Sequence, residues 1–297
     1  MFVPLISKRR PSLARRKGGG KSSVGKSSSS KSSSGSASTS SKGKSSSVST
    51  STGSKTATTY GAGGGKATTI ASGQYFAGRT EGGGTRTQVY GTWQYGSGYP
   101  SVSGSSVTGR GFPFYYWPVV WDGHSSHEPD LNTTAEYGSP NNASRPGGPL
   151  MTTSFQSNST GTIFRILADN ETVVALAGIV QSNCSSYMGQ NQPPNNGTAF
   201  SADDSPFPEQ VVQYYRASSA SLSIDGYNTS GLNTTTTPAL PAGVDMTLLM
   251  CLNYTIGAAI PLISYTTKNR HIADIVIGSV VFGLAVIVGL LKVCCDG

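Results

Sequence analysis

The sequence predicts a small α+β ectodomain with a disordered Ser/Gly/Lys-rich N-terminal tail and one C-terminal transmembrane α-helix. Three observations predict this class. Only 36% of the 297 residues are hydrophobic and 12% are charged. In a typical soluble domain about 45–50% of the residues are apolar and about 25% are charged. Basic residues gather at the N-terminus, and the longest apolar run lies near the C-terminus. The composition therefore excludes a globular enzyme that fills the whole length, because it supplies too little apolar material for such a core.

Residues 1–72 predict a disordered basic tail. The chain through Arg79 holds 14 Lys and Arg and no Asp or Glu, whereas the remainder carries 8 basic and 14 acidic residues. The tail has few large apolar side chains that would offset a backbone ordering entropy of about 1–2 kcal/mol per residue. Such a tail is either simply solvated or contacts a polyanion.

Residues 73–149 form a Gly- and aromatic-rich segment that we expect to consist mostly of loops. Twelve of the 26 aromatic residues lie between Tyr75 and Trp121, and Gly and Pro interrupt every longer element. Arg79, Arg86 and Arg110 lie among these rings, on which guanidinium groups stack. We interpret the segment as an aromatic cluster that packs on the next region, in preference to an RNA-binding segment.

Residues 150–264 resemble a conventional folded domain of about 110 residues. Alternating apolar residues predict strands, whereas apolar residues at helical spacing predict helices. Asp169 or Asn170 is a good N-cap for one of these helices, and Asp245 is a good N-cap for another. Pro208-Glu209 resembles the start of a further short helix. The expected order is a strand at 162–167, a helix at 170–184, a helix at 208–215, a strand at 220–224 and a helix at 245–256.

Residues 272–293 predict the transmembrane helix. Ile275 through Leu291 contains no charged side chain, and 22 helical residues span about 33 Å, against a hydrocarbon core of about 30 Å. The pairs Ser279/Gly283 and Ala285/Gly289 have the spacing that lets two helices approach, which suggests a weak homodimer. In the short tail 294–297, Cys294 and Cys295 are candidate lipidation sites.

Two signals disagree about the side of the membrane on which the body lies. Lys268 and Arg270 favour a cytosolic body, and residues 1–20 do not form a secretory signal. Against this, nine of the thirteen asparagines lie in Asn-x-Ser/Thr sequons, where chance predicts about three or four, and glycosylation requires the lumenal side. We therefore favour an extracytoplasmic body. The nine predicted N-glycosylation sites are Asn132, Asn142, Asn158, Asn170, Asn183, Asn196, Asn228, Asn233 and Asn253.

The cysteines of the body support the lumenal interpretation. Cys184 and Cys251 are the two cysteines before the apolar run. They either close one disulfide, which an oxidising compartment permits, or remain two buried free thiols.

No catalytic residue can be named from the sequence. His124 and His127 lie with three carboxylates in residues 122–130, a set that is able to bind zinc or copper, but the segment matches no zinc-protease motif. We interpret it as a solvated loop. The chain has no nucleophile elbow, phosphate-binding loop or Cys-x-x-Cys motif. We therefore expect no enzyme activity, no cofactor and no metal site.

Four segments carry a resemblance to a known group. They are "GRGFPFYYWPVVW", "FRILADNETVV", "EQVVQYYRASSASLSIDGYN" and "DMTLLMCLNYTIGAAIPL". The chain resembles uncharacterised fungal (basidiomycete-type) single-pass membrane proteins with a Gly/Ser-rich N-terminus, over about residues 73–291. The resemblance implies architecture only, and this chain departs from the pattern at its start, where a secretory signal is expected.

These observations predict a membrane-anchored glycoprotein of the secretory pathway or plasma membrane with a structural or binding role. Its basic tail would contact an anionic polysaccharide or matrix polymer, and nucleic acid is not the expected partner. The alternative is a cytosolic tail-anchored protein whose tail binds RNA or acidic lipid. A third hypothesis, an ectoenzyme that uses His124 and His127, has the least support.

Overall fold

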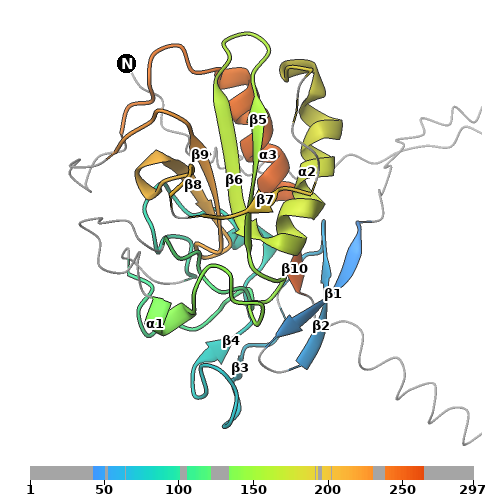
Figure 1. The fold of residues 1–297 in the computed structure, drawn as a ribbon. Helices are drawn as coiled ribbons and strands as arrows, with labels where there is room; N and C mark the ends of the chain where they lie inside the picture. Colours follow the sequence, from blue (N-terminus) through green and yellow to red (C-terminus); the bar gives the residue numbers. More distant parts are fainter. Residues whose placement is uncertain are drawn as a thin grey trace, which may run out of the picture. The chain divides into compact units, whose positions relative to one another are not determined.

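The structure is a computed structural model that describes residues 43–50, 53–63, 65–100, 106–121, 134–190, 192, 196–201, 203–229 and 238–263. These residues belong to one compact unit that begins at Gly43. They form a mostly β domain in which two helices, of 15 and 14 residues, accompany three sheets (Figure 1).

The largest sheet is antiparallel and has five strands in the order β7-β5-β6-β9-β8. Phe155 lies opposite Phe164, which lies opposite Ile224. Residues directly opposite each other in an antiparallel pair point to the same face, so these three buried side chains share one face of the sheet. The strands are β5 (Leu150–Gln156), β6 (Ile163–Asp169), β7 (Thr198–Ala199), β8 (Val211–Tyr215) and β9 (Ala220–Ile224).

Two helices pack against each other and against this sheet. α2 (Asn170–Cys184) begins where β6 ends and contacts β5 and β6, and α3 (Met246–Ala259) contacts α2. The side-chain hydroxyl of Tyr215, which shares the sheet face of Phe164, donates to Asn253 of α3 at 2.6 Å. The helices therefore cover that face. Shorter elements are α1 (Thr134–Tyr137) and the 3-10 turns η1 (Arg86–Gln88), η3 (Ser185–Tyr187) and η4 (Pro208–Gln210).

A second sheet joins the start of the domain to its end. β2 (Gly53–Thr58) lies between β1 (Ser45–Thr50) and β10 (Leu262–Ile263), and all its pairings are antiparallel (Figure 1). Val48 and Ala57 are fully buried in this sheet. The hairpin is therefore held against the segment that follows α3. The third sheet is the short pair β3 (Thr68–Thr69) and β4 (Thr80–Glu81).

The aromatic segment supplies much of the core. Nine of its rings are at most 8% exposed, and they belong to the same hydrophobic cluster as the strands and helices of the central sheet. Aromatic side chains bury about 150–250 Å² each, so a few of them replace many aliphatic residues. The nine are Tyr95, Tyr99, Phe112, Phe114, Tyr115, Tyr116, Trp117, Trp121 and Tyr137.

The structure corrects the predicted fold class in three respects. The fold is mostly β rather than a small α+β domain, since strands begin at Ser45, inside the range predicted to be a disordered tail, and one core runs from Val48 to Ile263. The helix predicted at 208–215 is wrong: after one 3-10 turn the chain forms β8, because β-branched and aromatic residues pair with β9. β5 was not predicted at all.

The third correction concerns the membrane. Within the part of the chain that the structure describes, no helix is both long enough and apolar enough to cross a membrane. The residues predicted to span it, 272–293, lie outside that part, as do the candidate lipidation sites Cys294 and Cys295.

Candidate functional site

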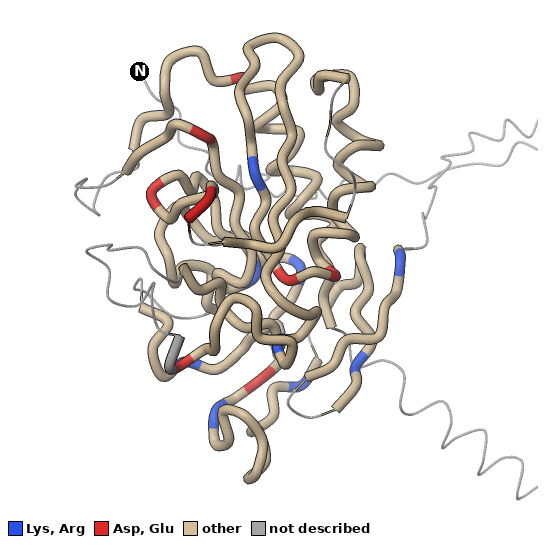
Figure 2. The backbone as a smooth tube through the Cα atoms, in the orientation of Figure 1, with Lys and Arg blue, Asp and Glu red and all other residues tan. Residues whose placement is uncertain are grey.

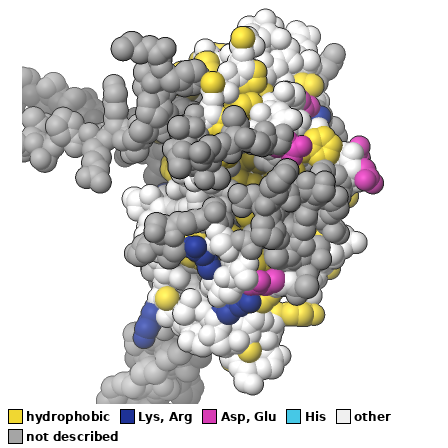
Figure 3. All heavy atoms as spheres, turned by 90° about the vertical axis from the view of Figure 1, so that its left-hand side faces the viewer, with side chains coloured by type: hydrophobic (Ala, Val, Ile, Leu, Met, Phe, Trp, Pro, Cys, Tyr) yellow, Lys and Arg dark blue, Asp and Glu magenta, His cyan; other side chains and the backbone are white. Residues whose placement is uncertain are grey.

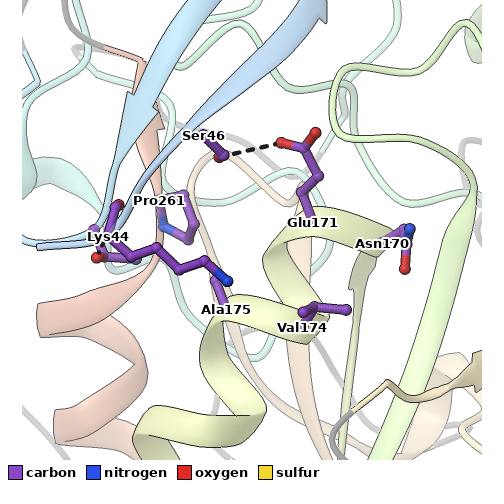
Figure 4. Close-up of a pocket in the computed structure, with 8 residues that line it drawn as sticks. Lys44, Ser46, Asn170, Glu171, Val174, Ala175 and Pro261 are labelled. Carbon is purple, nitrogen blue, oxygen red and sulfur yellow. Dashed lines mark hydrogen bonds between the residues drawn. The ribbon is translucent and has the colours of Figure 1, made fainter.

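A small pocket lies between the first turns of α2 and the β1–β2 hairpin (Figure 4). Its volume is about 200 Å³, whereas pockets that hold drug-sized ligands have about 300–1,000 Å³. It therefore has room for a few waters or a small fragment. Its lining residues are Lys44, Ser46, Thr59, Asn170, Glu171, Val174, Ala175 and Pro261.

Glu171 is the carboxylate of this pocket. Ser46 donates its hydroxyl to Oε2 of Glu171 at 3.3 Å, and the Lys44 side chain enters the same space (Figure 4). Partial burial, followed by the charge of Asp169, raises the pKa of Glu171, while Ser46 and Lys44 act in the opposite direction. Because the carboxylate lies in the first turn of α2, it offsets the positive end of the helix dipole. This makes the pocket a poor anion site.

Beneath this pocket lies a fully buried ion pair. Arg216 has no exposed surface, and its Nη2 donates to Oδ2 of Asp169 at 2.6 Å. Its other nitrogens donate to the Ser219 and Thr172 hydroxyls and to the Pro261 carbonyl. The guanidinium carbon lies 3.4 Å from the ring centroid of Tyr116. One side chain thus links the β8–β9 turn, the start of α2, the segment after α3 and the aromatic segment.

The turn that carries Arg216 is strained. Arg216, Ala217 and Ser218 have φ values of +52°, +51° and +61°, a region that costs residues other than glycine about 1 kcal/mol or more each. Backbone hydrogen bonds hold the turn: the Arg216 amide donates to Val89, and the Val119 amide donates to Ser218. The residues of the turn are at most 2% exposed, so the turn lies in the core of the domain.

The arginines of the aromatic segment also serve the fold. Arg79 lies over Phe76 and Tyr137, and Arg110 lies over Tyr99, so the predicted ring stacking is confirmed for these two. Arg86 behaves differently, since it donates to the carbonyls of Gly61, Gly257 and Ile260 and thereby completes the end of α3.

Arg145 is a buried cation that carbonyl oxygens surround. It donates to the carbonyls of Tyr137, Trp117 and Pro118, and burial lowers its pKa to about 10. Neither Arg145 nor Arg216 is recognisable as a buried cation from the sequence, because only the folded chain brings their partners together.

Charged groups are few on the surface of the described domain and are often paired. Three further ion pairs are Lys55–Glu81, Arg79–Glu136 and Arg165–Asp225. In Figure 2 the basic residues lie mainly in the lower part of the view, near β1–β4. Figure 3 shows one face of the molecule, on which yellow hydrophobic side chains alternate with white atoms and the few charged side chains are scattered. This arrangement does not form the basic stripe typical of nucleic-acid-binding domains.

Neither a family model, nor a curated protein, nor a solved structure matches this chain. The resemblance to fungal single-pass proteins therefore stays a prediction, and the function is argued from the residues of this chain alone.

Seven of the nine sequon asparagines lie among the described residues, and each has accessible surface. Asn158, Asn183, Asn196 and Asn228 are exposed, and Asn142, Asn170 and Asn253 are half-buried. Asn158 lies in the β5–β6 turn, and its Nδ2 donates a hydrogen bond to the carbonyl of Ser186, just beyond α2. Asn170 belongs to the rim of the pocket, where a glycan would restrict entry. Asn132 and Asn233 lie outside the described residues.

The two cysteines of the domain form a disulfide. Cys184, at the end of α2, and Cys251, in the middle of α3, are bonded, with their Cα atoms 5.9 Å apart. The bond connects the two helices across 67 positions of sequence.

Metal ligands do not gather in the described part of the chain, where no group of three or more His, Cys, Asp or Glu side chains is placed to hold an ion. His124 and His127 lie outside the described residues.

Proposed function

We propose that this chain is an N-glycosylated protein of the secretory pathway or cell surface whose domain has a binding or structural role and no catalytic activity. The observation that carries the proposal is the surface position of the sequons. All seven described sequon asparagines are exposed or half-buried, although they are spread over turns, helices and loops. Each described sequon therefore leaves its asparagine with surface at which a glycan can be attached.

The disulfide supports the same compartment. Disulfides persist in oxidising environments such as the secretory pathway and are rare in the cytosol. The bond between α2 and α3 restrains two helices whose mutual packing forms part of the core. A structural role of this kind requires oxidising conditions during folding.

A non-catalytic role agrees with the chemistry of the pocket. Its volume is about 200 Å³, and its single carboxylate, Glu171, has a serine and a lysine as polar neighbours. A glycan on Asn170 would stand at its rim. Binding by the protein would therefore use its outer surface and, we propose, the basic residues before Gly43, which suit an anionic polysaccharide or matrix polymer.

The test is removal of N-glycans from the full chain produced in a secretory eukaryotic host. We expect a gel shift after enzymatic deglycosylation, and a smaller mass for Asn158→Gln. The matched control is Asn141→Gln, which changes an exposed asparagine outside any sequon and should leave the mass pattern unaltered. Alkylation without reductant should leave Cys184 and Cys251 unmodified.

An unglycosylated chain would refute the proposal. If the mobility is unchanged, and both cysteines react with the alkylating reagent without reduction, the protein resides in a reducing compartment. The cytosolic alternative, with a basic tail that binds RNA or acidic lipid, would then replace it.

A further inference from the structure

The outer face of α3 carries a row of large exposed apolar side chains. Met246, Met250 and Tyr254 are 42%, 52% and 74% exposed. They are spaced four residues apart, so they follow one another along one face of the helix. A row of large apolar side chains along one exposed helix face is a candidate binding surface.

A second tyrosine extends this face. Tyr90 is 44% exposed, and its ring lies 5.7 Å from that of Tyr215. Its hydroxyl donates to the backbone carbonyl of Asn253 at 3.3 Å. Burial, and next the neighbouring hydroxyl of Tyr254, raise the pKa of Tyr90. Tyr90 therefore contacts the backbone of Asn253, and Tyr254 is the next residue along the helix.

Gly257 makes room for Tyr90. A Cβ atom at this position would lie 2.0 Å from both Cζ and the hydroxyl oxygen of Tyr90. The absence of a side chain one turn after Asn253 thus lets the tyrosine ring lie directly against the helix.

Asn253 is a sequon asparagine whose amide is held in one orientation. The Tyr215 hydroxyl donates to Oδ1 at 2.6 Å, which fixes the oxygen side of the amide. Nδ2, the atom to which an N-glycan attaches, has no hydrogen bond to another residue of the described domain. The residue is half-buried, so a sugar attached there begins close to the protein surface.

We propose that Tyr90 and Tyr254 form a stacking surface for the first N-acetylglucosamine of a glycan on Asn253, and that this glycan covers the apolar face of α3. The inference rests on the proposed function. The attachment forms the bond between Nδ2 and C1 of the sugar, breaks the bond between C1 and the diphosphate of a lipid-linked donor, and releases one amide proton. The C–H face of the sugar ring then packs against the aromatic rings, whose faces carry partial negative charge.

The experiment uses the full chain from a secretory host, trimmed by an endoglycosidase to one N-acetylglucosamine per site. Mass spectrometry of glycopeptides first establishes occupancy at Asn253. We then expect the N-acetylglucosamine proton resonances assigned to this site to be shifted upfield by the rings, and the shift to be lost in Tyr254→Ala. Gly257→Ala, which displaces Tyr90, should reduce the shift. Tyr60→Ala changes a tyrosine on another part of the domain that is as exposed as Tyr90 (45% against 44%), and it should leave the shift intact.

Thermal unfolding gives a second readout. We expect Asn253→Gln to lower the Tm by about 2–4 °C more in the parent protein than in the Tyr254→Ala background, as stacking worth about 1 kcal/mol implies for a domain of this size. The lost Tyr215 hydrogen bond is common to both backgrounds and cancels in this cycle. The same cycle with Asn196→Gln, at an exposed sequon outside α3, should be additive.

The outcomes separate the two proposals. Glycans at other sequons and none at Asn253 would overturn this inference and leave the proposed function standing. An occupied Asn253 without an upfield shift or Tm coupling would also overturn it. A chain without any N-glycan would refute the proposed function itself.

Discussion

Replacement of Asp169 by Asn should destabilise the domain strongly, because it leaves the Arg216 guanidinium charged and without its carboxylate in the core. The Arg216 side chain has no exposed surface, and that of Asp169 is 5% exposed. Removal of one partner from a buried ion pair costs about 3–5 kcal/mol. The substitution keeps a side-chain oxygen that is able to accept from the Thr172 amide, so the N-cap of α2 need not be lost.

The structure places the cost at the lower end of that range. Arg216 keeps its hydrogen bonds to Ser219, Thr172 and Pro261 and its position over the Tyr116 ring, which partly compensate the charge. We therefore expect a loss of about 3 kcal/mol. For a domain of this size this corresponds to a decrease in Tm of about 6–12 °C.

The assay is urea unfolding of the oxidised full chain, followed by circular dichroism and by the fluorescence of Trp117 and Trp121, which are buried. The matched control is Asp225→Asn. Asp225 also pairs with an arginine, Arg165, through two hydrogen bonds of 2.7 and 2.8 Å, but both side chains are about one quarter exposed. We expect this control to lose about 1 kcal/mol or less, since solvent screens the pair.

Equal losses in the two variants would show that burial does not determine the cost of breaking the pair. The double-mutant cycle with Arg216→Met gives an independent test, because contacting charges in one network couple by up to about 3 kcal/mol. A coupling energy below about 0.5 kcal/mol would contradict the interpretation that the two side chains act as one unit.

Three further predictions concern other parts of the domain. Replacement of Cys184 and Cys251 by Ala should lower the free energy of unfolding by up to about 4 kcal/mol, as the 67-residue separation implies, which urea unfolding measures. The pKa of Glu171 is raised in the folded state, so its protonated form adds stability below its unfolded pKa of about 4.3, and this stability is lost as the pH rises through the folded pKa. The free energy of unfolding of Glu171→Gln, relative to that of the parent, should therefore be higher at pH 7 than at pH 4. Unfolding titrations at the two pH values measure this difference, and the reverse trend would contradict the burial argument. Val48→Ala should cost about 1–2 kcal/mol in the same assay, because Val48 is fully buried in β1, whereas a solvated tail would show no change.

The elements with local signals were predictable from the sequence. α2 and α3 begin directly after Asp169 and Asp245 because these carboxylates accept hydrogen bonds from the first amides of each helix. β9 alternates Ala220, Leu222 and Ile224 with serines. Each of these signals lies within a few residues of the element that it specifies.

The elements that depend on distant partners were not predictable. β1 and β2 consist almost entirely of Ser, Thr, Gly and Lys, and only Val48 and Ala57 are fully buried. The pairing of β2 with β10 joins segments about 200 residues apart. The turn before β8 carries a helix-like signal at Pro208, but β9 supplies the hydrogen-bond partners of β8. Tertiary pairing overrides local preference in both cases.

The low hydrophobic content suggested that only the part of the chain after residue 150 forms a core, but the core of the structure also includes earlier residues. The core contains aromatic rings from a glycine-rich segment, two fully or nearly fully buried arginines, and buried serines of β9. Arg145 and Arg216 are admissible there because carbonyls, a carboxylate and aromatic faces satisfy them. A domain of this kind requires fewer aliphatic residues than one built from Leu and Val, but each buried polar group makes it depend on a specific partner. The same 36% hydrophobic content therefore supports a core that extends from β1 to β10 and not only the part after residue 150.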